Sequence, residues 1–319
     1  LQIDVRATEP GPARSRTMPL PQLAAPLLAR SLERVAGKLI AVDASIDFAT
    51  PVGEPALIGP DSISWQVFRN PLSMFVGGVA AVLLELGEPG VRTAVWRHSS
   101  FRADPVRRLR RTGLAAMITV YGARSRMEET AARVRAMHGR VHGETPAGTP
   151  YRADDPELLR WVQGTAAFAF LAAYRRYVRA VPAADRDRYY AEGAAGSAMY
   201  GAEGAPASEA ALEAMLAAMS PRLEPSPILD ELVAILRIAA ILPPPLRPMQ
   251  HVAIRAAVDL LPPALRTRLR LERHGRLTLA EATMLCGLGA TLDAAHFPTS
   301  PAARACVRLG LPADYLVRR

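Results

Sequence analysis

Residues 98–162 read HSSFRADPVRRLRRTGLAAMITVYGARSRMEETAARVRAMHGRVHGETPAGTPYRADDPELLRWV. This stretch holds three of the six histidines of the chain, together with a dense group of arginines. The apolar run in its middle, residues 114–121, has the composition of a buried segment. Basic groups, histidines and a buried segment in one span predict a site for an anionic ligand, and that ligand could carry iron.

The same stretch predicts two consecutive helices. Pro105 follows Asp104 at a helix start, where proline fits because its missing N–H would have no partner. This helix runs to Tyr121. The second helix begins with acidic residues and ends with basic ones, which suits the helix dipole. At spacings of three and four, we expect one face of it to carry Arg135, His138 and His142.

The rest of the chain also favours helix. Its Ala-rich and Leu-rich segments carry apolar residues at spacings of three and four and are separated by prolines. No alternating strand pattern and no repeat is found, and residues 143–155 predict a turn-rich connection. Helices are expected at residues 23–42, 72–86, 91–99, 156–178, 183–199, 208–219, 228–242, 248–261 and 279–292. The sequence therefore predicts an all-α fold built as one large helical domain.

One of these helices, at residues 72–86, is apolar on all sides and should be buried on several of them. The pair Gly77 and Gly78 in its middle would let a neighbouring helix or a flat ligand come close. We expect close helix packing at this pair.

The charge of the chain indicates which kinds of anionic partner it could bind. The formal net charge is +9, and Lys38 is the only lysine among the 39 basic residues. The guanidinium group suits recognition of carboxylate or phosphate at two points. However, the arginines are spread over the whole chain, aromatic residues rarely lie between them, and no nucleic-acid motif occurs. Nucleic acid is therefore not an expected partner.

The number of cysteines and the absence of long apolar segments indicate the cellular compartment of the protein. Cys286 and Cys306 are too few for a disulfide framework. The first residues lack the apolar core of a signal peptide, and no run of about 18 apolar residues predicts a membrane span. A cytoplasmic protein is the expectation.

Several catalytic motifs are missing from the sequence. His138 and His142 lack the glutamate of a HExxH zinc site, and there is no GxSxG elbow, phosphate-binding loop or dinucleotide fingerprint. From the residues alone, His138 is either an ordinary half-buried histidine or the axial ligand of a haem. In the second case, arginines would neutralise the haem propionates.

A set of motifs resembles a known family. The motifs are GPDSISW (59–65), HSSFRADPVRRLRRT (98–112), YG (121–122), RVRAMHGRVHG (133–143) and PYRADDPELLRWV (150–162). In this order they resemble the DUF2236 family, the latex-clearing rubber oxygenases and the fungal MpaB-type oxygenases. The resemblance covers roughly residues 56–265. It implies an all-helical, globin-like core that holds haem b and cleaves carbon–carbon double bonds with dioxygen.

The resemblance also implies roles for individual residues. The RxxH element places His138 as the axial iron ligand, with Arg135 orienting the helix face or a propionate. The RxxxT element places Arg108 and Thr112 near the haem, where they would polarise bound oxygen or fix the haem. His98 either lines the pocket or is a packing or capping residue at a helix terminus. His142 is a second-shell group, a competing ligand or a surface residue.

The chain departs from the family pattern at three positions. Many members have His where this chain has Glu88 or Gln163, and many have Arg where it has His142. These departures concern the chemistry on the oxygen-binding side of a haem. Lys38 is the sole candidate for a distal lysine of the kind that the rubber oxygenases use.

The predicted organisation has three parts. Residues 1–55 would form an arm and a leading helix, residues 56–265 the oxygenase core, and residues 266–319 a helical extension packed on it. The expected function is a haem-b-dependent oxygenase that acts with dioxygen on a hydrophobic small molecule. The alternatives are a non-catalytic helical protein that binds such a molecule without haem, and a structural partner protein. A homodimer is a further expectation.

Overall fold

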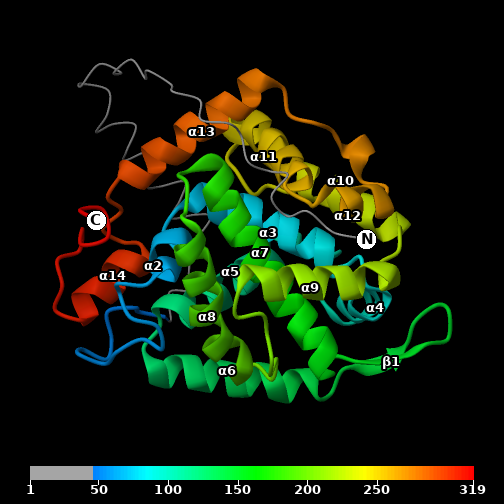
Figure 1. Cartoon of the computed structure of the whole chain (residues 1–319), viewed down its shortest axis with the longest axis horizontal. Helices are drawn as coiled ribbons and strands as arrows, with labels where there is room; N and C mark the ends of the chain where they lie inside the picture. The colour runs from blue at the N-terminus through cyan, green and yellow to red at the C-terminus, as the bar shows by residue number, and fades with distance from the viewer. Residues whose placement is uncertain (1–45) are drawn as a thin grey trace.

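The computed structural model describes residues 46–319, which are mostly helical (Figure 1). The all-α prediction is confirmed. The predicted arm, the helix expected at residues 23–42 and Lys38 lie outside the described residues. The globin-like arrangement of the core stays a prediction.

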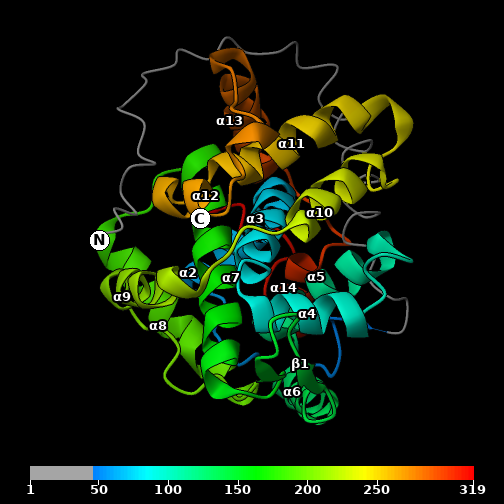
Figure 2. The same cartoon turned by 90° about the vertical axis from the view of Figure 1, so that its right-hand side faces the viewer.

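Two long helices, α3 (Pro71–Glu85) and α7 (Pro156–Tyr177), lie side by side at the centre of the molecule (Figures 1 and 2). They meet at Gly77, where an added Cβ would lie only 2.8 Å from the Cα of Phe170. The absence of a side chain at this position lets the two backbones approach closely. The prediction of close helix packing is therefore confirmed at Gly77, whereas an added Cβ at Gly78 would meet only the ring atom Cε1 of Phe170, at 3.9 Å.

The helices begin where capping chemistry predicts. Asn70 accepts hydrogen bonds from two backbone N–H groups in the first turn of α3. Asp104 caps α5 (Pro105–Tyr121), and Glu88 caps α4 (Pro89–His98). In each of these helices a capping side chain accepts hydrogen bonds from backbone N–H groups of the first turn. The proline that follows the cap has no N–H group, so it leaves no donor without a partner.

Helix α6 (Arg124–His138) ends earlier than the sequence pattern predicts. His142 lies beyond it, in strand β1 (His142–Glu144). The prediction of one helical face carrying Arg135, His138 and His142 is therefore wrong. Gly139 follows the helix as its C-cap, and glycine costs a helix interior about 1 kcal/mol relative to alanine.

The segment expected to be a plain connection forms a β-hairpin instead. Strand β1 pairs antiparallel with β2 (Pro150–Arg152), with Gly143 opposite Tyr151. The turn between them closes through a hydrogen bond from Thr145 N–H to Thr149 O (2.8 Å), and Gly148 adopts φ 80°. Strands of three residues are too short to produce an alternating pattern in the sequence.

The remaining helices enclose this centre. α11 and α13 pack against α3, and α13 also packs against α7. Helix α10 stops at Ile238, four residues before the sequence pattern ends it, because a proline run follows. The short helices α12 and α14 were not predicted. The bounds are α2 Ile63–Phe68, α8 Ala183–Met199, α9 Glu209–Met219, α10 Pro227–Ile238, α11 Arg247–Asp259, α12 Pro263–Arg268, α13 Leu279–Ala294 and α14 Pro301–Arg308.

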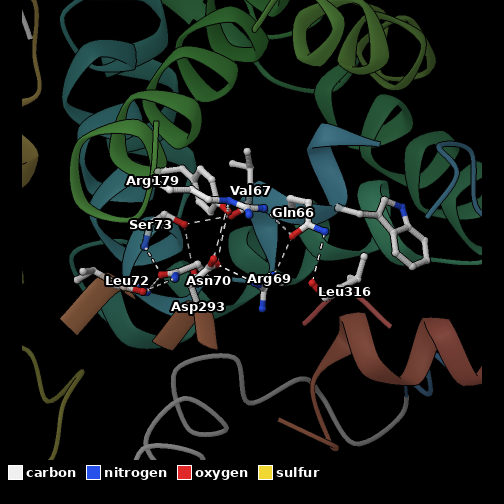
Figure 3. A network of polar contacts seen from close by, with 12 residues as sticks. Gln66, Val67, Arg69, Asn70, Leu72, Ser73, Arg179, Asp293 and Leu316 are labelled. Carbon is white, nitrogen blue, oxygen red and sulfur yellow. Dashed lines mark hydrogen bonds and ion pairs between the residues drawn. The ribbon is translucent and has the colours of Figure 1, made fainter. Parts of the chain in front are cut away.

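A polar network joins the start of α3 to α13 (Figure 3). Asn70 Nδ2 donates to the carbonyl oxygen of Gly289 at 3.0 Å. Arg69 forms an ion pair with Asp293 at 3.0 Å. Because residues of α13 hold residues near the start of α3, the C-terminal part of the chain is tied directly to the central helix pair.

No single helix among residues 46–319 has both the length and the apolar character needed to cross a membrane. Helices α3 and α4 meet those requirements only together, and the chain bends by 111° between them.

Candidate active site

A cavity of about 330 Å³ lies between α3, α5 and α7. Its volume is within the range of about 300–1,000 Å³ that is usual for small-molecule sites. His138 at the end of α6, Tyr200 directly after α8, and Ile241 after α10 complete the wall. Most of the wall is apolar, including Phe75, Val79, Val82, Leu109, Leu114, Ala115, Ala116, Leu159, Val162, Ala166 and Phe170.

The cavity is elongated because three helices border it over similar lengths. The lining residues fall within residues 74–85 of α3, residues 106–119 of α5 and residues 159–170 of α7. Eleven residues of α-helix span about 16 Å. The cavity opens to solvent near Arg110 and Thr112, which line it and are themselves exposed.

His138 presents a half-buried imidazole ring at the cavity wall. Its Nδ1 atom is buried and has no hydrogen-bond partner among the described residues. Burial lowers the pKa of the ring below its usual value, the Arg108 guanidinium lowers this pKa further, and Asp154 acts in the opposite direction. The ring is therefore neutral at pH 7, which is the form that binds a metal ion.

Arg108 and Thr112 share one face of α5, as their spacing predicts, and both line the cavity. The Arg108 guanidinium donates to Thr112 Oγ1, and that hydroxyl donates back to the Arg108 carbonyl at 3.0 Å. Burial lowers the pKa of Arg108, whereas the nearby Glu85 raises it. The half-buried cation is thus held in place by a residue one turn along the same helix.

Glu85 is a cavity residue that the sequence did not reveal. It is the last residue of α3 and the only charged side chain of that helix. Burial raises the pKa of Glu85 to about 7, although Arg108 acts in the opposite direction. A carboxyl group that titrates near pH 7 can hold or release a proton under ordinary conditions. In the sequence, the only indication of this role is that Glu85 is a single acidic residue at the end of an otherwise apolar helix.

The structure brings together only part of the predicted site. His138, Arg108 and Thr112 line one cavity, whereas Arg135 and His98 do not line it. Arg135 is exposed on α6. His98 is exposed as well, and its Nε2 atom lies 3.2 Å from the hydroxyl of Tyr151 on the hairpin.

His142 also lies away from the cavity, because it is exposed on β1. This position corresponds to the surface alternative among the three considered for it. Glu88 is buried as the cap of α4, where Arg222 contacts it at 3.2 Å, and it does not line the cavity either.

Three further polar residues line the cavity without having been predicted to do so: Gln163, Thr119 and Tyr200. Gln163 occupies the position where many members of the resembled family have His. Thr119 and Tyr200 are joined by a hydrogen bond of 3.0 Å between their hydroxyl oxygens. Thr119 lies inside an apolar run, and Tyr200 comes from a distant helix end, so only the folded chain brings them together.

The donor set suits a metal that brings its own ligands. Among the described residues, no group of three or more His, Cys, Asp or Glu side chains is placed to hold a metal ion. A haem carries its own equatorial nitrogen ligands and needs one axial group from the protein. A neutral imidazole with a cation nearby, on an apolar cavity wall, fits that requirement.

Residues 65–294 match the family described as ER-bound oxygenase mpaB/B'/Rubber oxygenase, catalytic domain. The match covers well over half of the chain, so the chain belongs to this family of oxygenase catalytic domains. Its function is therefore of the oxygenase type, with dioxygen and a small molecule as the implied reactants. The resemblance stated from the motifs is confirmed.

No curated protein and no solved structure matches the chain. The family match passes residue 265, the predicted end of the core, and includes the whole of α13. The division of the chain into three parts stays a prediction.

Proposed function

We propose that this protein is a haem-b-dependent oxygenase that acts with dioxygen on an apolar small molecule, with His138 as the axial ligand of the iron. One observation carries the proposal: a neutral imidazole, whose Nδ1 atom has no hydrogen-bond partner among the described residues, lines an elongated apolar cavity. An ordinary core histidine would be expected to satisfy its buried ring nitrogens.

The cations beside the cavity would hold the anionic edge of the cofactor. Arg108 is half-buried, and Arg110 is exposed beside it. Guanidinium groups bind carboxylates at two points, so both suit propionate groups. When bound, the haem would supply dioxygen binding and one-electron chemistry.

The protein's own side chains would control polarity and protons. Arg108 would donate hydrogen bonds toward oxygen atoms near the open end of the cavity, while Thr112 holds its guanidinium group in place. Glu85, with its pKa of about 7, would hold a proton on its carboxyl group or accept one from a reacting group. The aliphatic wall would exclude water and bind the apolar part of the substrate.

The second candidate function is haem-free binding of a hydrophobic molecule. The predominantly aliphatic lining of the cavity favours it. The two functions differ in one respect that can be measured, because only the first requires iron in the purified protein.

The test is the absorption spectrum of protein produced with a haem precursor. We expect a Soret band and roughly one iron per chain. The His138→Ala variant should lose the band, whereas Arg108→Ala should keep it and have weaker activity. His142→Ala is the matched control, because His142 is an exposed histidine four residues away and should not affect the band. Colourless wild-type protein, or a full band in His138→Ala, would contradict the proposal.

A further inference from the structure

Two of the neutral polar residues of the cavity, Thr119 and Tyr200, lie far from its charged residues. On α5, Arg108 and Thr119 both line the cavity and are eleven residues apart, about 16 Å along the helix axis. Glu85 and His138 interact electrostatically with Arg108 and so belong to the charged end. Thr119 marks the other end, with Tyr200 beside it. A ligand that fills the cavity would therefore meet a pair of hydroxyl groups at that end.

The hydrogen-bond geometry fixes which way these hydroxyls point. Thr119 Oγ1 lies 2.9 Å from the carbonyl oxygen of Ala115 and 3.0 Å from the hydroxyl oxygen of Tyr200. A carbonyl oxygen can only accept, and a hydroxyl carries one hydrogen, so Thr119 donates to Ala115. Thr119 must then accept the hydrogen of Tyr200. The Tyr200 oxygen keeps acceptor capacity but has no hydrogen left to offer a ligand.

This direction selects one kind of ligand group. Tyr200 is buried, and burial raises the pKa of its hydroxyl, so the group stays neutral. A ligand hydroxyl would donate to the Tyr200 oxygen. A ketone or ether oxygen at the same place would face lone pairs without receiving a hydrogen bond, which is unfavourable in an apolar cavity.

Building on the oxygenase function proposed above, we propose that the substrate is an apolar molecule bearing a hydroxyl group, an alcohol or a phenol. Its O–H donates to the oxygen of Tyr200, and its chain extends along α5 toward Arg108, Glu85 and His138. Tyr200 and Thr119 are then specificity-determining residues, because together they distinguish a donor from an acceptor at the end of the substrate.

The test compares 1-octanol with 2-octanone, which have the same numbers of carbon and oxygen atoms, by calorimetric titration of the full chain as purified. We expect 1-octanol to bind about three- to tenfold more tightly, the effect of one neutral hydrogen bond. Tyr200→Phe should remove this preference. Thr119→Val should remove it as well, because the Tyr200 hydrogen is then free to be donated to the ketone oxygen or to the alcohol oxygen alike.

Thr165→Val is the matched control. Thr165 donates in the same way to the carbonyl oxygen of the preceding turn, Trp161 O at 2.9 Å, but it does not line the cavity. This variant should keep the alcohol preference of the wild type. If Tyr200→Phe fails to fold, the loss of the alcohol preference in Thr119→Val is the deciding measurement.

The inference is overturned if wild-type protein binds neither probe, binds both equally or prefers the ketone, or if Thr119→Val still prefers the alcohol. These outcomes are separate from the spectrum that tests the proposed function. Protein without a Soret band that prefers the alcohol would refute the haem assignment and support the hydroxyl preference. A haem protein without that preference would refute the inference alone.

Discussion

Glu85 shows how position changes the chemistry of a side chain. It lies at the end of the apolar helix α3, against the cavity that Arg108 also lines. Burial disfavours the carboxylate, and the single neighbouring cation compensates only in part, so the pKa of Glu85 rises from 4.5 to about 7. The position of this acid therefore carries a cost in stability that depends on pH.

The sign of that dependence follows from proton binding. The folded protein binds the Glu85 proton more tightly than the unfolded chain, so the cost is absent well below pH 4.5 and complete above about pH 7. Glu85→Gln removes it. We expect the stability gained by this variant to be about 2 kcal/mol larger at pH 8 than at pH 5, as measured by urea unfolding.

A surface variant gives the control for this experiment. Glu128→Gln breaks an exposed pair with Arg124 and should change stability by less than about 1 kcal/mol at either pH. A Glu85→Gln variant whose stability gain is the same at pH 5 and pH 8 would show that this carboxyl does not titrate near pH 7.

Sequence reasoning found the cavity residues that belong to local motifs. Arg108 and Thr112 belong to the RxxxT element and His138 to the RxxH element of the resembled family, so each could be selected without knowing the fold. Glu85 and Tyr200 gain their roles only when α3 and α8 meet α5, and no local pattern records that contact. His98 and Arg135 were included because of the resemblance, and their positions depend on tertiary packing in the same way.

At the scale of elements, α3 and α7 pack against each other at the centre of the molecule, and both border the cavity. The two helices approach at Gly77, and Gly78 is the neighbouring position, where an added Cβ would meet only the ring atom Cε1 of Phe170 at 3.9 Å. An added Cβ on Gly77 would lie 2.8 Å from the Cα of Phe170, and a backbone atom cannot rotate away as a side chain can.

The two glycines therefore predict opposite effects of the same substitution. Gly77→Ala should destabilise the protein by about 1–3 kcal/mol, because the helices must separate to admit the methyl group. Gly78→Ala should be neutral or slightly stabilising, since alanine favours helix. Thermal unfolding of both variants measures the difference. Equal effects would mean that Gly77 is not the closest point of the helix pair.

Long helices with apolar periodicity were predicted because their signal extends over several turns. The helices expected at residues 183–199 and 208–219 agree with α8 and α9 to within one residue. The hairpin of β1 and β2 and the short helices α12 and α14 were missed, since too few residues define their periodicity. Helix α6 was predicted to reach His142 because His138 and His142 are four residues apart, although Gly139 between them ends the helix.

At the scale of the whole molecule, the ion pair between Arg69 and Asp293 connects residues that are far apart in the chain (Figure 3). The two side chains retain only 9% and 14% of their exposure. Arg69 also donates to Gln66 at 3.0 Å. This pair anchors α13 at the central helices, and α13 lies within the residues that match the family.

Asp293→Ala should therefore destabilise the whole domain. The substitution leaves the buried Arg69 guanidinium without its carboxylate partner, which costs about 3 kcal/mol. Asp314→Ala breaks a surface ion pair with Arg318 and should leave the stability nearly unchanged. Urea unfolding of both variants tests this. A small effect of Asp293→Ala would show that the C-terminal helices are held mainly by apolar packing.

The central claim is that the His138 imidazole holds a haem in the cavity between α3, α5 and α7. The most direct test is the absorption spectrum of the His138→Gly variant supplied with haem, recorded with and without imidazole in the buffer. We predict that the wild-type Soret band is absent without imidazole and returns when imidazole occupies the place of the missing ring. A variant that shows the wild-type band without imidazole would contradict the claim.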